Sequence, residues 1–151
     1  VLLGIISGDQ LYISGKYDGN PTMSVTIRRH QSLHITHGAH GKAVFSFLDP
    51  EKRLRILDTS QTFFHGKPEN LDREKLEQEI QFCRENGFAV DDAMLTPGIR
   101  ALSSPLFDHS NNVAAAIVLV GTFPKSKFKS FGSLTAQTAR AISKKAGATV
   151  S

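Results

Sequence analysis

The amino-acid sequence predicts a single α+β domain in which helices pack on a mainly antiparallel β-sheet. β-rich runs occur in hairpin groups near both ends of the chain, whereas helical patterns collect in the middle and at the C-terminal end. Residues 113–120 (VAAAIVLV) are apolar on both faces, as in a central strand that is covered on each side. With 151 residues, the chain is long enough to bury one hydrophobic core.

The N-terminal part of the chain predicts strands. Residues 1–7 and 11–17 are short β-rich runs joined by Gly8 and Asp9, which is a strong hairpin signal. Residues 24–29 alternate between apolar and polar side chains and therefore predict a third strand.

The segment 32–48 (SLHITHGAHGKAVFSFL) is the stretch around which we expect the rest of the chain to be organised. It predicts an extended arm over 33–35, a glycine-bounded turn over 38–41 and a helix over 42–48. The start of a helix directs free amide groups and a partial positive charge outward, which suits a carboxylate or phosphate. No Asp or Glu occurs in 19–48. A small-anion pocket is one interpretation, and an ordinary helix start with a basic surface is the other.

Two helices are predicted in the middle of the chain. The run 49–51 (Asp-Pro-Glu) is a typical helix start, and we expect Leu54 and Leu57 to face the core. Residues 59–68 are irregular, which places His65 at the surface.

The second of these helices is expected to begin at an Asn70 cap and to stop at Gly87. One apolar stripe at helical spacing is formed by Leu76, Ile80 and Cys83. Cys83 is therefore interpreted as a packed thiol rather than a reactive one.

The C-terminal part predicts three strands and a final helix. The strands cover 88–95, 99–107 and 113–120, and the helix covers 130–146. We expect this helix to bury Leu134, Ala141 and Ile142.

Composition excludes several classes of protein. No apolar run approaches the roughly 20 residues that a membrane-spanning helix needs. The net charge is +4, but the basic residues are spread out and are not interleaved with aromatic side chains, so a nucleic-acid surface is not favoured. A single cysteine rules out an internal disulfide and predicts a cytoplasmic protein. The first ten residues lack a leader pattern and resemble a strand already under way, so we expect a missing N-terminal partner.

Two segments together resemble a known family. Residues 33–51 (LHITHGAHGKAVFSFLDPE) and 86–124 (NGFAVDDAMLTPGIRALSSPLFDHSNNVAAAIVLVGTFP) are similar to the C-terminal effector-binding domain of the isocitrate lyase regulator (IclR) family of bacterial transcription factors. The resemblance covers essentially all of 1–151. It implies a GAF-like fold, helices on both sheet faces, a small-molecule effector, and homodimers or homotetramers. It also implies an N-terminal winged helix-turn-helix, absent from this chain, through which the regulator binds DNA.

The resemblance also implies a ligand site, position by position. Ala39 and His40 would offer backbone amides to a ligand carboxylate, and Asp91 would accept a hydrogen bond from a ligand hydroxyl or amide. Apolar walls would come from Val25, Leu33, Ala101, Val118 and Val120. The family often has a pair of glutamates after the aspartate, where this chain has Asp-Ala-Met at 92–94. The expected effector is a small organic acid with an apolar body, and no cofactor is expected.

Three alternatives remain open at this point. His34, His37 and His40 follow the spacing i, i+3, i+6 and are candidate zinc ligands, although no carboxylate or cysteine lies nearby in sequence. A free-standing GAF-type sensor of small ligands is a second alternative. An enzyme is not favoured, because the chain has no Gly-x-Ser-x-Gly motif, and Asp91 and Asp92 should point to opposite faces of a strand.

Overall fold

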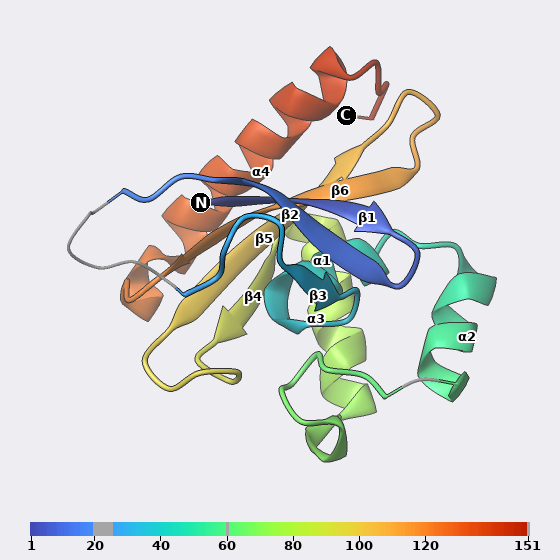
Figure 1. Cartoon of the computed structure of the whole chain (residues 1–151), viewed down its shortest axis with the longest axis vertical. Coiled ribbons are helices and arrows are strands. Elements are labelled where there is room, and N and C mark those ends of the chain that lie inside the picture. The colour runs from blue at the N-terminus through green and yellow to red at the C-terminus, as the bar shows by residue number, and fades with distance from the viewer. Residues whose placement is uncertain (20–25, 60, 151) are drawn as a thin grey trace.

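The computed structural model describes residues 1–19, 26–59 and 61–150, and its six strands form one antiparallel sheet in the order β3-β2-β1-β6-β5-β4 (Figure 1). In chain order the elements are β1 (Leu2–Ser7), β2 (Gln10–Lys16), β3 (Ser32–His34), α1 (Gly38–Phe45), α2 (Pro50–Thr59), the 3-10 turn η1 (Pro68–Asn70), α3 (Arg73–Asn86), β4 (Ala89–Asp92), β5 (Arg100–Phe107), β6 (Val113–Gly121), η2 (Lys125–Lys127) and α4 (Phe128–Lys145). The predicted α+β class and antiparallel sheet are confirmed, and β6 lies centrally between β1 and β5.

Helices cover both faces of the sheet, as expected. Successive residues of β4 show this directly, because Ala89 packs with Ala43 of α1 whereas Val90 packs with Ala136 of α4. Successive strand residues point to opposite faces, so α1 and α4 must lie on opposite sides. α3 packs beside α1 through Cys83, which is buried as predicted.

The middle helices begin and end where local chemistry requires. Asp49 caps α2 by accepting a hydrogen bond from the Lys52 amide at 2.9 Å. α3 is capped by Asp72, whose Oδ1 accepts from the Lys75 amide at 3.0 Å, so the predicted Asn70 cap was wrong. Gly87 ends α3 with φ of 81°, a left-handed conformation that glycine adopts without steric cost.

The helix at the centre of the sequence prediction starts earlier than expected. α1 begins at Gly38, four residues before Lys42, and the Gly41 amide donates to the His37 carbonyl at 3.0 Å. The glycine-bounded segment is therefore the first turn of the helix and not a separate turn. Glycine is required at 41, because a Cβ there would lie 2.2 Å from the Thr36 carbonyl carbon.

Two strand predictions need correction. Residues 26–29 are not a strand, and the remainder of the predicted strand lies outside the described residues. Ile27 still packs against the core, and the Gln31 amide donates to the Arg28 carbonyl, so Ile27 reaches the core from an irregular segment and not from a strand. β4 is shorter than the predicted 88–95, because the chain turns after Asp92.

Two predictions about helix faces were also wrong. Leu57 of α2 packs against the core as predicted, but Leu54 is 60% exposed and Ile56 makes the other core contact in its place. α4 exposes Leu134 and Ile142, together with Ala141. It buries a set of small residues: Gly132, Thr135, Ala136, Ala139 and Ser143. Small side chains let α4 approach the sheet closely. The buried side of α4 is therefore distinguished by small side chains rather than by hydrophobic ones. Within the described residues, no helix is long and apolar enough to cross a bilayer.

The close approach at Gly41 leads to a testable prediction. Replacing Gly41 with Ala should lower the free energy of unfolding by at least about 2 kcal/mol, because the methyl group meets backbone that cannot rotate away. Gly15→Ala is the matched control, since its Cβ would lie an ordinary 3.4 Å from Leu3 Cβ. Urea titration of both variants measures the difference. Equal stability of the two variants would contradict the assigned contact.

Candidate functional site

The start of α1 presents two buried backbone amides that lack an acceptor. The Gly38 amide donates to the Phe63 carbonyl at 3.2 Å, and the Gly41 amide donates to the His37 carbonyl at 3.0 Å. Between them, the amides of Ala39 and His40 have no hydrogen-bond acceptor among the residues that the structure describes. Both residues are buried. Buried amides in folded proteins are nearly always paired, so this arrangement favours an external acceptor.

The sheet places three of the predicted site residues in one row. Asp91 of β4 is paired with Ala101 of β5, and Ala101 is paired with Val120 of β6. Directly paired residues of antiparallel strands project from the same face. Leu33 and Val118 belong to the same apolar cluster as Ala101 and Val120. Four of the five expected apolar walls are therefore neighbours, and Val25 lies outside the described residues.

The imidazole of His40 is neutral in the folded protein. Burial lowers the pKa of His40 to about 3, with a smaller contribution from the neighbouring His37. Its Nε2–H donates to the His34 carbonyl at 3.2 Å, which joins α1 to the end of β3. The side chain therefore lines the start of α1 without adding a positive charge.

Asp91 is buried and its carboxylate already holds part of the chain. Its Oδ1 accepts a hydrogen bond from the Met94 amide at 3.1 Å, within a turn where Ala93 has φ of 57°. Burial raises the pKa of Asp91, while the nearby Lys42 ammonium and the amides of Met94 and Leu95 act in the opposite direction. Asp91 thus shapes this turn and retains capacity to accept a further hydrogen bond.

The same turn brings Leu95 against the start of α1. A Cβ added to Gly38 would lie 2.8 Å from Leu95 Cδ2, so the leucine side chain rests directly on the first residue of the helix. Gly38 has φ of 57°, which also favours glycine at this position. Leu95 therefore covers the end of α1 from the β4 side.

A buried ion pair fixes α1 in place. Lys42 is 1% exposed, and its Nζ donates to Glu79 Oε1 at 2.8 Å and to the Val90 carbonyl at 2.9 Å. His65 Nε2 donates to Glu79 Oε2 at 2.7 Å, and His65 Nδ1 accepts from the Asp72 amide at 3.3 Å. One carboxylate of α3 thereby binds both α1 and the loop before α3.

Sequence reasoning missed this network. The predicted surface position of His65 was wrong, because its side chain is 1% exposed. A signal was available, since Glu79 lies three residues after Leu76 and four before Cys83, on the buried side of α3. Lys42 likewise directly precedes the apolar run 43–48, which favours a buried element.

The histidines do not form a metal site in the described part of the chain. No group of three or more metal-binding side chains is assembled there. His34 Nδ1 is instead bonded to the Thr36 hydroxyl at 2.7 Å, while the rings of His37 and His40 stack with centroids 5.5 Å apart. The spacing of these histidines is explained by local packing.

Ser103 and Ser104 lie within β5 and are both buried. The Ser103 hydroxyl donates to the Ile117 carbonyl at 3.1 Å. Asp91 and Asp92 diverge as predicted, since Asp92 forms ion pairs with Arg100 at 2.8 Å and Lys125 at 2.7 Å near the surface. None of these groups forms a nucleophile and base pair.

Comparison with known proteins identifies the family. The sequence model of the family described as "Bacterial transcriptional regulator IclR C-terminal" matches residues 1–144. The chain belongs to the IclR family. Members of the family are transcriptional regulators and not enzymes, in agreement with the sequence prediction.

Individual IclR-family proteins agree in sequence and fold. The HTH-type transcriptional regulator KipR of Bacillus subtilis is 29% identical over 116 residues, which are 76% of this chain and 46% of KipR. The Agobacterium tumefaciens repressor BlcR superimposes with a TM-score of 0.80 at 24% identity, covering 99% of this chain and 60% of BlcR. The Thermotoga maritima IclR gives a TM-score of 0.77 at 24% identity, covering 97% and 60%. This chain thus spans about half the length of the curated relatives that it matches, and the predicted GAF-like fold is confirmed.

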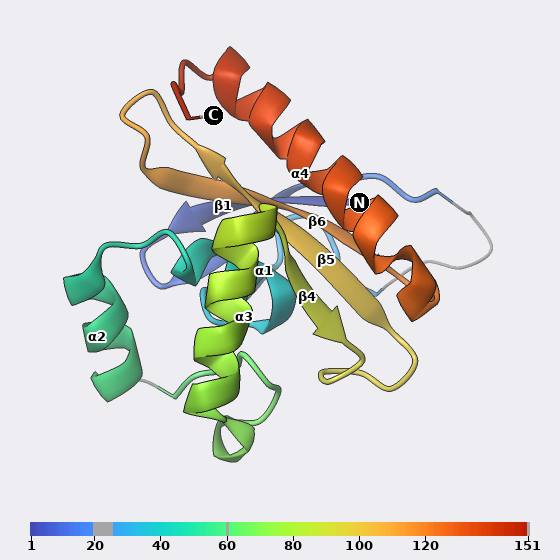
Figure 2. The same cartoon turned by 180° about the vertical axis from the view of Figure 1, so that it is seen from behind.

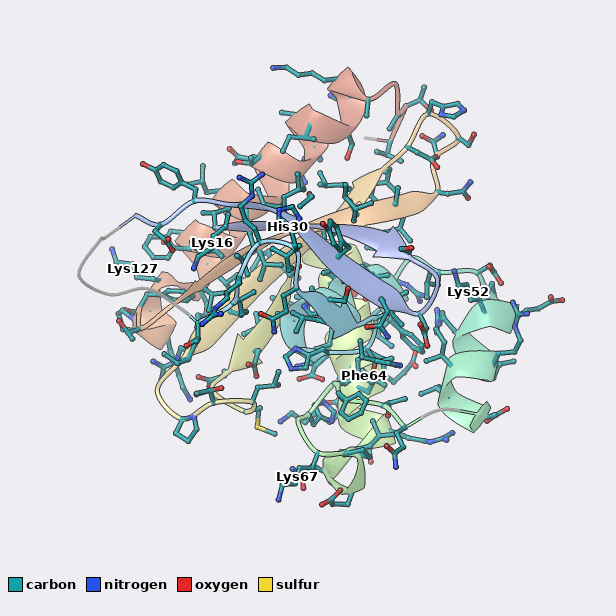
Figure 3. All side chains as sticks on the ribbon, in the orientation of Figure 1. Lys16, His30, Lys52, Phe64, Lys67 and Lys127 are labelled. Atoms are coloured by element: carbon teal, nitrogen blue, oxygen red, sulfur yellow. The ribbon has the colours of Figure 1, made fainter. Side chains whose placement is uncertain are left out.

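The ion pair of Lys42 generates a stability prediction. Lys42→Met should lower the free energy of unfolding by about 3 kcal/mol, because the half-buried Glu79 carboxylate and the Val90 carbonyl lose the ammonium that they bind. Lys67→Met is the control, since Lys67 projects into solvent from the loop before α3 (Figure 3) and should change stability by less than about 0.5 kcal/mol. Chemical denaturation measures both variants. An unaffected Lys42→Met protein would disprove the structural role of the pair.

The neutral state of His40 predicts a pH dependence. The unfolded chain binds a proton at this histidine below pH 6.5, whereas the folded chain does so only near pH 3, so stability falls as pH decreases through this window. Between pH 7 and pH 5 this histidine should account for a loss of about 2 kcal/mol. Between pH 7 and pH 5, the free energy of unfolding of the His40→Gln variant should therefore fall by about 2 kcal/mol less than that of wild type. The variant of the exposed His109, His109→Gln, should fall as much as wild type. If the free energy of unfolding depended on pH identically in wild type and His40→Gln, the low pKa of His40 would be contradicted.

Proposed function

We propose that this chain is the effector-sensing domain of a DNA-binding transcriptional regulator and that its effector is a small monocarboxylate bound at the start of α1. One observation carries the proposal: the buried amides of Ala39 and His40 have no acceptor in the described part of the chain. A carboxylate supplies two oxygens that accept such bonds, and the helix dipole favours its negative charge.

The surroundings of these amides favour a single negative charge. The two basic side chains of α1 add no free positive charge, because Lys42 is paired with Glu79 and His40 is neutral. Asp91 on the facing sheet row disfavours further negative charge. A dianion would therefore meet too little positive potential, whereas a monoanion is matched by two amides.

The rest of the site favours an apolar body with one polar group. Leu33, Ala101, Val118 and Val120 pack in one cluster and offer hydrocarbon surface to a ligand. A polar ligand atom left unpaired there costs roughly 1–3 kcal/mol. Asp91 is the exception, because its carboxylate accepts a hydrogen bond from a ligand hydroxyl or amide. Short-chain and aromatic acids fit these conditions.

The proposed site lies between α1, β3 and the turn after β4, so a bound ligand can change how these segments are arranged. A ligand that contacts α1, β3 and the turn after β4 favours the arrangement of these segments that binds it best, which shifts the population of states. The family and its half-length match to helix-turn-helix regulators support an N-terminal DNA-binding domain that reads this shift. A homodimer or homotetramer connects the two functions.

Calorimetry with acetate, butyrate, hexanoate and benzoate tests the ligand class. At least one acid should bind the 151-residue chain, and Ala101→Trp should weaken that binding at least roughly 30-fold, because the indole would project from the sheet row between Asp91 and Val120 where the ligand is proposed to bind. Ser110→Trp, in the exposed β5–β6 loop, is the size-matched control. Unchanged affinity in Ala101→Trp, or no binding of any acid by wild type, would contradict the proposal.

A further inference from the structure

The turn after β4 carries a sulfur atom that solvent can reach. The sequence contains one cysteine and two methionines. Cys83 is fully buried, and burial raises the pKa of its thiol to about 11, so it carries almost no reactive thiolate. Met94 is 43% exposed, whereas Met23 lies outside the described residues. Within the described part of the chain, Met94 is therefore the sulfur that a dissolved oxidant can attack.

The sulfur of Met94 lies beside a lysine side chain. Lys75 Nζ is 3.9 Å from Met94 Sδ, and a thioether is only a weak hydrogen-bond acceptor. Among the residues that the structure describes, no carboxylate forms an ion pair with Lys75. The Lys75 ammonium therefore keeps its capacity to donate to a better acceptor at the position of the sulfur.

The turn after β4 and the start of α3 are neighbours. Figure 2 shows both at the same end of the molecule. A Cβ added to Gly66, in the loop before α3, would lie 3.6 Å from the Met94 carbonyl oxygen. The Asp72 cap holds the first turn of α3, because its Oδ1 accepts a hydrogen bond from the Lys75 amide at 3.0 Å. Lys75 is therefore held at a fixed helix end beside the turn.

Met94 is part of the turn that covers the start of α1. Its amide donates to Asp91 Oδ1 at 3.1 Å, and the residue before it, Ala93, has φ of 57°. A left-handed conformation is unfavourable for alanine, so the turn depends on the contacts that hold it. The next residue, Leu95, rests on Gly38 at the first position of α1. A new bond to the Met94 side chain would therefore restrain the segment that covers the candidate site.

We propose that Met94 is an oxidation site whose sulfoxide joins the turn after β4 to the start of α3. The oxidant is a hydroperoxide such as hydrogen peroxide. The Met94 sulfur attacks one peroxide oxygen, and a sulfur–oxygen bond forms as the oxygen–oxygen bond breaks. The proton of the transferred hydroxyl goes to the departing hydroxide, which leaves as water. The sulfur loses two electrons, and the peroxide gains them.

The sulfoxide oxygen forms where the Lys75 ammonium already lies. Methionine sulfoxide is polar, and its oxygen accepts a charge-assisted hydrogen bond from the ammonium, which the thioether does only weakly. Because Met94 is exposed, the added oxygen does not have to be buried without a partner. Oxidation therefore restrains the turn, and enzymatic reduction of the sulfoxide releases it. The proposal does not depend on the effector, since it rests on the contacts of Met94 and Lys75.

Oxidation of a chain with a single methionine tests the proposal. Met23→Leu removes the other methionine of the 151-residue chain, so any methionine sulfoxide that forms is at position 94. After treatment with hydrogen peroxide, mass spectrometry should find one added oxygen on the peptide that contains Met94. Hydrogen exchange of the backbone amides in 93–98 should then slow roughly 10-fold, as expected from one hydrogen bond to a charged group.

Matched variants identify the donor. M23L/K75M should form the sulfoxide without the slower exchange, whereas M23L/K75R keeps a donor and should retain the slower exchange. M23L/K67M removes an exposed lysine from the loop before α3 and should behave like M23L. If Met94 resisted hydrogen peroxide that oxidises N-acetylmethionine amide, the proposal would be overturned. A sulfoxide that leaves exchange in 93–98 unchanged or faster, or that slows it equally in M23L/K75M, would overturn it as well.

Discussion

The buried ammonium of Lys42 determines where α1 can lie, and the candidate site depends on that position. α1 has only eight residues, too few to be stable without tertiary contacts. Lys42 ties it at once to Glu79 of α3 and to the Val90 carbonyl of β4. Because the ammonium is almost fully buried, any displacement of α1 would leave a charge without a partner. The helix is thus held with its first turn facing the sheet row that contains Asp91.

The charged groups of α1 stabilise its position and are not available to a ligand. The Lys42 ammonium is paired with Glu79, and burial keeps His40 neutral. What remains at the start of the helix is a pair of amides, together with a carboxylate and hydrocarbon on the sheet. Leu95 covers this region through a turn that Asp91 itself stabilises. A ligand that engages Asp91 therefore acts on the same turn that covers the site.

Sequence reasoning succeeded where local chemistry decides the outcome. The hairpin at Gly8, the left-handed stop at Gly87 and the apolar run of β6 follow from residue properties that tertiary structure does not override. It failed where packing decides, because the inner face of α4 is selected for small side chains and Leu134 is left outside. His65 was expected at the surface because its partner Glu79 is 14 positions away in the sequence. Seven of the eight expected ligand residues could be placed, but their positions came from the family resemblance, and periodicity alone would not have selected Ala101 or Asp91.

The most direct test of the account observes the two amides themselves. In a nitrogen-15 NMR titration of the chain with the acid from the acetate, butyrate, hexanoate and benzoate series that binds most tightly, the amide protons of Ala39 and His40 should move downfield. Their shifts should saturate at the dissociation constant found by calorimetry, as expected for donors to a carboxylate. Saturable shifts confined to other segments, with Ala39 and His40 unmoved, would show that the anion binds elsewhere and would contradict the account.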